Sequence, residues 1–242
     1  MKRKVRNTMM IISLLLFPIT MNYLSPYVSI DGAIQGLVTG SLLVFFALFL
    51  SGMVLGRSWC GWLCPMGSLS DICLKSNARN VNFGKMRIFR YSVFGLWAVI
   101  LLAMFALSGG IRGISPLHLT ESGISVDAPM KYIVYCLVVF LFLLLTLLLG
   151  KRGACQSICW IAPFLTAGYH VGRFLRLPQL RIVSQKENCV SCGACEKACP
   201  MSLPVGTLHK SGAIRTSDCI LCGECVDACK RKTLGYKIVR KS

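Results

Sequence analysis

The chain has 242 residues, of which 55% are apolar and 15% are charged, and its formal net charge is +18. Long apolar runs dominate the first 150 residues, a composition typical of a membrane protein with a soluble tail. The basic residues flank these runs instead of forming a separate patch, and this distribution argues against nucleic-acid binding.

The apolar runs predict an α-helical membrane protein with four transmembrane helices, at about residues 9–24, 33–55, 91–107 and 132–149. The first run follows a basic amino terminus and could also be read as a signal peptide. No small-residue cleavage motif follows it, so we expect an uncleaved span that Pro18 kinks. Gly36, Gly40 and Gly52 lie at multiples of four in the second run, which predicts close contact with another helix.

The distribution of charge predicts the orientation. The amino terminus carries four Lys or Arg, and the 57–90 loop carries six. The loops on the opposite side, residues 25–32 and 108–130, have almost no Lys or Arg. Positive loops mark the cytoplasmic side of a membrane. We therefore expect a multi-pass protein of the inner (plasma) membrane, with both termini and the tail in the cytoplasm.

The chain after the fourth predicted span changes character. Residues 161–177 are apolar with two arginines, which predicts a helix lying at the membrane interface. Pro178 ends that helix. We expect three parts: a membrane domain at 1–160, an interfacial helix and linker at 161–180, and a small α+β domain at 181–242. A domain of that size buries little core, so bound metal would stabilise it.

The tail contains the same cysteine run twice, each with the spacing C-x2-C-x2-C-x3-C. This is the spacing of bacterial ferredoxins, in which the fourth cysteine of each run ligates the cluster of the other run. Disulfides do not require this spacing twice, and zinc sites use C-x2-C pairs. Gly193 and Gly223 occupy matching positions, where a tight loop needs permissive dihedrals.

We therefore predict two 4Fe–4S clusters in the tail. The expected ligands of the first cluster are Cys189, Cys192, Cys195 and Cys229. The expected ligands of the second are Cys219, Cys222, Cys225 and Cys199. Such clusters assemble in reducing compartments, in agreement with a cytoplasmic tail.

Two further cysteine pairs follow predicted spans at the cytoplasmic side. Cys60 and Cys64 have the C-x3-C spacing, and so do Cys155 and Cys159. On a helix, positions four apart share a face, so the two pairs could form one four-thiolate site. That site could hold a third iron–sulfur cluster, hold zinc, or cycle between dithiol and disulfide. Buried cysteines that only pack are the alternative.

Other residues have weaker signals. We expect Cys73 and Cys136 to pack in the core instead of binding metal. A quinone needs an apolar slot with one or two hydrogen-bonding groups. Tyr169 and His170, near Trp160, are the candidate quinone contacts, although an interfacial aromatic belt is the more common explanation for such residues.

The motifs together resemble a known family. The stretch Trp59-Cys60-Gly61-Trp62-Leu63-Cys64-Pro65, a second C-x3-C pair and the two ferredoxin runs are similar to the NapH-type membrane-bound 4Fe–4S ferredoxins. These are quinol dehydrogenase subunits associated with periplasmic nitrate reductase. Trp160 stands where that family usually has proline, which suggests a divergent branch.

The resemblance implies an electron-transfer subunit of a quinol dehydrogenase-type complex. It would pass electrons between the quinone pool, or a membrane redox partner, and the cytoplasmic clusters. The alternative is an assembly factor that reduces a metal or a disulfide for another redox enzyme. A transporter is disfavoured because the predicted spans contain no ionisable Asp, Glu, Lys, Arg or His. The expected partners are the lipid bilayer and redox proteins, with no nucleic acid.

Overall fold

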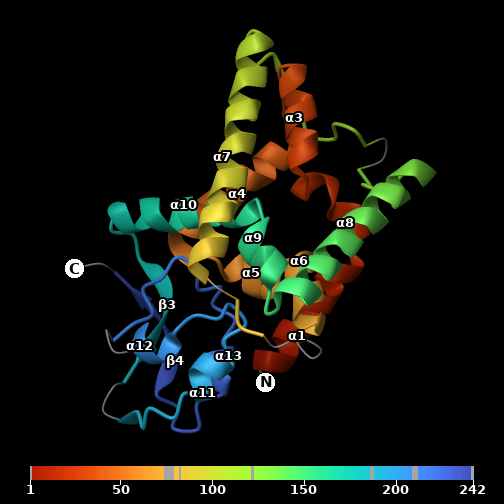
Figure 1. The fold of residues 1–242 in the computed structure, drawn as a ribbon. Helices are drawn as coiled ribbons and strands as arrows, with labels where there is room; N and C mark the ends of the chain where they lie inside the picture. Colours follow the sequence, from red (N-terminus) through yellow and green to blue (C-terminus); the bar gives the residue numbers. More distant parts are fainter. Residues whose placement is uncertain are drawn as a thin grey trace.

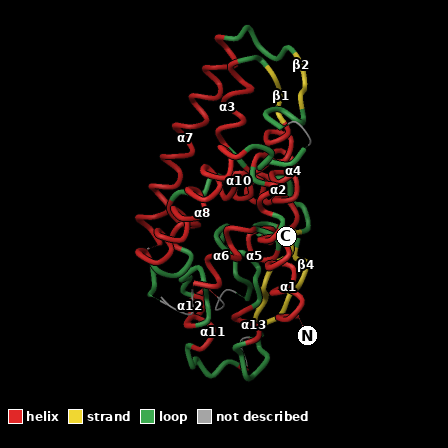
Figure 2. The backbone as a smooth tube through the Cα atoms, turned by 90° about the vertical axis from the view of Figure 1, so that its right-hand side faces the viewer, coloured by secondary structure: helices red, strands yellow, loops and turns green. Residues whose placement is uncertain are grey.

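The computed structural model describes residues 2–73, 79–81, 83–120, 123–185, 188–208 and 212–240. Long helices extend from one side of the molecule, and the small domain built from the tail lies at the other (Figure 1). Seen from a perpendicular direction, β1 and β2 occupy one end, and α11 and α13 the opposite end (Figure 2). The paired strands β1 (Leu37–Thr39) and β2 (Gly113–Ser115) are parallel.

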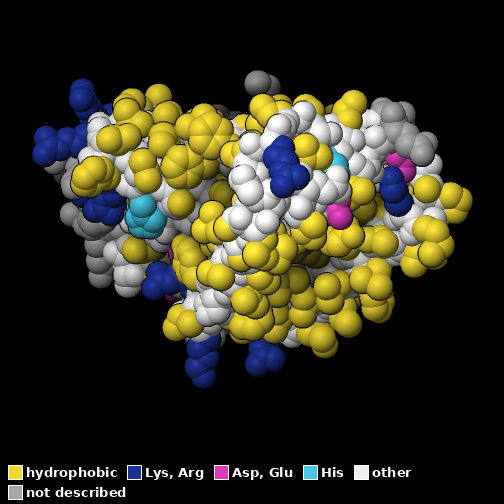
Figure 3. Space-filling model, turned by 90° about the horizontal axis from the view of Figure 1, so that it is seen from above, with side chains coloured by type: hydrophobic (Ala, Val, Ile, Leu, Met, Phe, Trp, Pro, Cys, Tyr) yellow, Lys and Arg dark blue, Asp and Glu magenta, His cyan; other side chains and the backbone are white. Residues whose placement is uncertain are grey.

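Two of the described helices are long and apolar enough to cross a membrane. They are α7 (Phe83–Leu107), through its residues 84–107, and α8 (Pro129–Leu149). At 24 and 21 residues they can extend over about 36 and 32 Å, against a hydrocarbon thickness of about 30 Å. Only 6% and 11% of their apolar windows are buried. Hydrophobic side chains cover much of the face seen in Figure 3.

The first predicted span is not a single helix. Residues 2–24 form α1 (Lys2–Leu15), α2 (Phe17–Thr20) and the 3-10 helix η1 (Asn22–Leu24). Pro18 lies in the first turn of α2. Because proline has no backbone N–H to donate, it interrupts the helix more strongly than the predicted kink.

The second predicted span is also divided. It begins in α3 (Pro26–Ile34), turns at Gly36 with φ of +70°, passes through β1 and continues as α4 (Gly40–Leu55). With 16 residues, α4 extends over about 24 Å, less than the apolar thickness of a bilayer. Among the described helices, two and not four therefore meet the length expected of a span.

The helix that follows the second cysteine pair, α10 (Ile161–Phe174), packs closely against α4. A Cβ on Gly52 would lie 2.7 Å from the Leu165 carbonyl oxygen, so the predicted close contact at Gly52 is confirmed. Gly168 and Gly172 on α10 lie as tightly against the α4 backbone. The prediction of a helix at 161–177 is thus correct to Phe174, and one of its sides is buried against the protein.

Short helices follow the long ones at the tail side. After α4 come α5 (Ser58–Trp62) and α6 (Pro65–Cys73), and after α8 comes α9 (Gly153–Ser157). Gly56 and Gly150 end the two long helices, both with positive φ and both donating their backbone N–H to the carbonyl four residues earlier. The helices α4 and α8 therefore end in the same way, at a glycine with positive φ.

The tail folds around an antiparallel pair of strands, β3 (Gln179–Ser184) and β4 (Leu234–Val239). β3 begins two residues before the predicted domain boundary at 181. Between the strands, the described residues include three one-turn α-helices: α11 (Ala194–Lys197), α12 (Val205–Leu208) and α13 (Glu224–Asp227). Gly193 and Gly223 precede α11 and α13 with φ of +72° and +84°, which confirms the conformation expected of both glycines.

Candidate iron–sulfur centres

The four thiols assigned to the first cluster line one cavity of about 520 Å³: Cys189, Cys192, Cys195 and Cys229. Cys189 and Cys192 come from the loop before α11, Cys195 lies in α11, and Cys229 comes from the segment after α13. This group lies at the molecular surface, where Cys192 and Val190 are exposed. The cavity also contains the side chains of Lys230 and Arg231.

The four thiols assigned to the second cluster line a smaller and more apolar cavity: Cys199, Cys219, Cys222 and Cys225. Its other walls are apolar, and Ile182, Met201 and Ile220 are almost fully buried. Burial raises the pKa of the Cys219 thiol to about 12 and that of Cys222 to about 11. A buried thiolate therefore needs a positive partner in this place.

The two tail cavities fit iron–sulfur ligation in their chemistry. Each presents four sulfurs, and backbone N–H groups point at several of them, such as those of Leu221 toward Cys219 and Glu224 toward Cys222. Hydrogen bonds of this kind stabilise cluster sulfurs. Among the residues that the structure describes, no three Cys, His, Asp or Glu side chains converge on the position of a single metal ion. The tail thiols instead line the walls of cavities.

The four thiols of the two C-x3-C pairs are all buried, with exposures between 4% and 8%. We call Cys60, Cys64, Cys155 and Cys159 the edge thiols. Burial raises the pKa of Cys64, and the neighbouring Cys60, Cys155 and Cys159 raise it further. Burial likewise raises the pKa of Cys159 to about 12, with contributions from Cys155 and Cys60. The fold therefore brings together the two pairs, which are separated by 90 residues of sequence.

The pairs do not lie on continuous helices as expected. In each pair the first cysteine is in a five-residue helix, and the second lies just before the next helix begins. Pro65 starts α6, while Trp160 precedes α10 and donates its indole N–H to the Leu24 carbonyl at 2.7 Å. Although position 160 is tryptophan instead of proline, the helix is interrupted at the second cysteine pair as it is at the first.

Two buried arginines adjoin the edge thiols and were not expected from the sequence. Arg57 is 1% exposed, pairs with Asp218 at 3.1 Å, and accepts the backbone N–H of Cys60 at its carbonyl oxygen at 3.0 Å. Arg152 is fully buried, binds both oxygens of Asp71 at 2.7 Å and donates to the Cys60 carbonyl at 2.7 Å. Each arginine stands three residues before a cysteine pair, a repeated spacing that was visible in the sequence.

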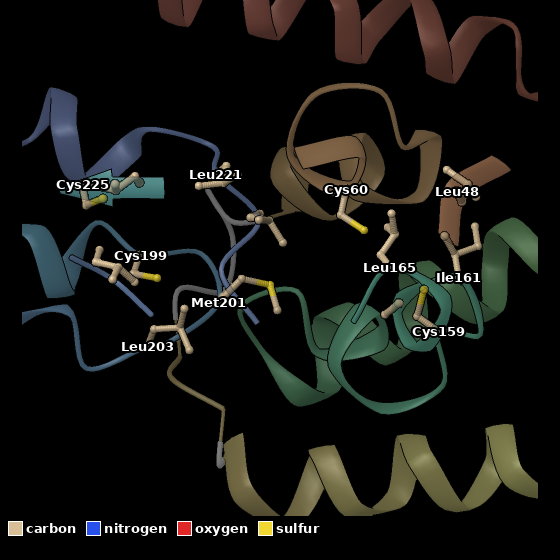
Figure 4. Close-up of a cluster of buried hydrophobic side chains, with 14 of the residues drawn as sticks. Leu48, Cys60, Cys159, Ile161, Leu165, Cys199, Met201, Leu203, Leu221 and Cys225 are labelled. Carbon is tan, nitrogen blue, oxygen red and sulfur yellow. The ribbon is translucent and has the colours of Figure 1, made fainter. Parts of the chain in front are cut away.

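The edge thiols lie against the second tail group. Asp218, which binds Arg57, immediately precedes Cys219. Trp62 donates its indole N–H to the Leu221 carbonyl at 3.0 Å, and Gly61 leaves no room for a Cβ beside Ile220. Cys60, Cys159, Cys199 and Cys225 belong to one buried core. In Figure 4, Met201 and Leu221 lie between the two sets of cysteines.

The remaining predicted residues have simpler surroundings. Cys73 is buried, while Cys136 on α8 is exposed and does not pack in the core. Tyr169 is buried beneath the Arg181 guanidinium, whereas His170 is exposed. The quinone contact proposed for Tyr169 and His170 stays a prediction.

Two apolar grooves of about 490 and 450 Å³ lie beside the first cysteine pair. Trp59 and Leu63 line both grooves. The first groove is completed by Leu221 and Tyr236 of the tail, and the second by Pro65 together with α1, η1 and α4 residues.

Comparison with known proteins identifies two iron–sulfur segments. Residues 37–84 match a 4Fe–4S binding domain family, and residues 188–234 match a 4Fe–4S dicluster domain family. The first segment includes Cys60 and Cys64, and the second includes all eight predicted tail ligands. The chain therefore carries two 4Fe–4S ferredoxin-type domains.

The chain is homologous to ferredoxin-type proteins. It is 25% identical over 193 residues to YccM of Escherichia coli K12, to which an electron transport role is ascribed. It is 28% identical over 177 residues to the methylamine utilization ferredoxin-type protein MauN of Methylorubrum extorquens. These matches cover 75% and 69% of this chain but only 52% and 58% of the relatives. The chain thus spans little more than half of their length.

An uncharacterized protein of Methanocaldococcus jannaschii, MJ0749, is 23% identical over 189 residues, which cover 74% of this chain and 68% of that protein. No solved structure matches the chain significantly.

Proposed function

We propose that this protein is a membrane-anchored iron–sulfur electron-transfer protein. The proposal rests on the arrangement of three groups of four thiols within one folded chain. The edge thiols lie against the second tail group. The electron transport role ascribed to YccM and the ferredoxin-type description of MauN support it.

The proposed cofactors are two 4Fe–4S clusters in the tail and a third metal–thiolate centre at the edge thiols. When bound, such clusters supply centres that accept and release single electrons. The chain holds them by its thiolates, directs backbone N–H groups at the sulfurs and surrounds the second group with apolar side chains. The first group remains at the surface, where a redox protein partner can approach.

Membrane anchoring is proposed from α7 and α8. Their apolar surfaces are almost entirely unburied, so they do not resemble core helices of a soluble protein. Arg6, near the amino terminus, pairs with Glu224 of the tail at 2.8 Å and lies on the same side as the edge thiols. We propose that this side faces the cytoplasm, in accordance with the charge of the loops.

The electron partner on the membrane side is proposed to be the quinone pool or a membrane redox protein, as for the NapH-type proteins that the motifs resemble. Of the surfaces near the edge thiols, the two grooves at Trp59 have the apolar lining that a quinone requires. They are better placed than Tyr169 and His170, because Trp59 is adjacent to Cys60.

The second candidate function is an assembly factor that reduces a metal or a disulfide for another redox enzyme. The closeness of the buried edge thiols favours it, since a dithiol pair could undergo thiol–disulfide exchange. This alternative predicts edge thiols that hold no iron.

Iron content tests the proposal. Full-length protein purified without oxygen should contain about twelve iron atoms, for three 4Fe–4S clusters, and the Cys64→Ser, Cys159→Ser variant about eight. If both proteins contain about eight, the edge thiols hold no cluster and the assembly factor is favoured. Four or fewer in the variant would contradict the two-cluster tail.

A further inference from the structure

We infer that Arg57 is the counter-charge of the centre held by the edge thiols and raises its reduction potential. The inference rests on the proposed function, because it requires a metal–thiolate centre at these thiols. It concerns only the arginines and carboxylates around that centre.

The first observation is a local structure that occurs twice. A long helix ends at a glycine with positive φ, an arginine follows, and a five-residue helix carries the first cysteine. The spacing from arginine to cysteines is R-x2-C-x3-C at both places. Each arginine is thus the residue that directly precedes the short helix carrying the first cysteine.

The second observation is the charge around Arg57. Asp218 is fully buried and accepts from Arg57 at 3.1 Å and from Arg90 at 2.8 Å, both at the same carboxylate oxygen. One carboxylate therefore faces two buried guanidinium groups and leaves one positive charge unbalanced. The backbone N–H of Cys60 donates to the Arg57 carbonyl at 3.0 Å. Burial would lower the pKa of Arg57, but the nearby Cys60, Asp218 and Cys159 raise it, so the excess charge lies beside the edge thiols.

Arg152 is balanced differently. Its guanidinium binds both oxygens of Asp71. Arg6 also pairs with Asp71 at 2.9 Å, but Arg6 has a second carboxylate, Glu224, at 2.8 Å, so two carboxylates face these two arginines. The remaining donor of Arg152 holds the Cys60 carbonyl. Arg152 therefore fixes the loop and has most of its charge neutralised, whereas the charge of Arg57 is shared with a carboxylate that already serves Arg90.

The consequence is electrostatic. A centre with four thiolates is anionic, and taking up one electron adds one negative charge without forming or breaking a bond. In a buried place, a nearby cation stabilises the more negative state more strongly than in water. Arg57 should therefore favour the reduced state and raise the reduction potential. A disulfide is neutral and would gain nothing from this arrangement in its oxidised form.

The test is a potentiometric titration of full-length protein with dithionite as reductant, followed by electron paramagnetic resonance. The signal that disappears in the Cys64→Ser, Cys159→Ser variant identifies the edge centre. In the Arg57→Gln variant, the midpoint potential of the edge centre should shift to more negative values. In the Arg57→Lys variant, the midpoint potential should lie close to the wild-type value. Asp218→Asn, which removes a negative charge, should shift it in the opposite direction.

Arg181→Gln is the matched control. Arg181 is also a buried arginine, but it contacts Gln179 and the ring of Tyr169. Its removal should leave the potential of the edge centre unchanged. Equal potentials in wild type, Arg57→Gln and Asp218→Asn would overturn the inference while leaving the cluster in place. Absence of any signal assignable to the edge thiols would contradict the proposed function itself.

Discussion

Gly61 shows how a single residue connects the edge thiols to the tail. It lies between the two cysteines of the first pair, and a Cβ there would collide with the Ile220 carbonyl and approach the Cys222 nitrogen to 3.3 Å. Both contacts are with backbone, which cannot rotate away as a side chain could. The neighbouring Trp62 adds a hydrogen bond to the same loop. Close approach at position 61 therefore sets how near the two groups of thiols can be.

We expect Gly61→Ala to destabilise the folded protein by about 1–3 kcal/mol, because a methyl group must displace the backbone of the Cys222 loop. The measurement is the thermal unfolding of detergent-solubilised protein with its clusters bound. Gly95→Ala is the control, since a Cβ at Gly95 on α7 meets no atom within 4 Å. It should leave stability unchanged or raise it slightly, as alanine favours helix. Equal melting temperatures for both variants would show that Gly61 is not a contact point.

At the level of elements, the part of the chain before the tail contains two similar helix ends, each followed by a short helix and a cysteine pair. α4 leads to α5 and α6, and α8 leads to α9 and α10, with a cysteine pair at each junction. α4 and α10 then pack against one another through glycines, so that the helix after the second pair returns to the helix before the first. The packing of α10 on α4 therefore fixes the two cysteine pairs beside each other more firmly than two helices without this contact could.

The helices also predict a topology. An even number of spans places both termini on one side, and Arg6 already contacts the tail. Alkaline phosphatase, which is active only outside the inner membrane, should therefore be inactive when fused after Ser242. A fusion placed after Arg112, in the loop between α7 and α8, should be active. Activity of the carboxy-terminal fusion would contradict the cytoplasmic orientation.

Much of this arrangement could be predicted from spacing. The cysteine runs and pairs are local patterns, and α7 and α8 each contain a long stretch without charged residues, at 91–107 and 132–149. The first two spans were predicted wrongly as continuous because average hydropathy does not register the break at Pro18 or the turn at Gly36. The role of Arg57 depends on Asp218, a partner 161 residues away, and no local pattern reveals such a pairing.

At the scale of the whole molecule, the three thiol groups lie in an order. The edge thiols share a buried core with the second tail group, and the first tail group lies beyond it at the surface. α11 and α13, which carry one cysteine each, lie in contact. In the proposed function, this order gives electrons a path from α7 and α8 to a soluble redox partner, with the most exposed thiols at the partner's end.

The measurement that tests the central claim most directly is the reduction of the tail clusters in the Cys64→Ser, Cys159→Ser variant. Membranes containing wild-type or variant protein would be supplied with a quinol, and tail-cluster reduction would be followed by electron paramagnetic resonance. Dithionite would serve as the control that the tail clusters are intact. The account predicts that dithionite reduces both proteins, whereas quinol reduces only the wild type. Quinol reduction of the variant at the wild-type rate would contradict it, because electrons would then reach the tail without the edge thiols.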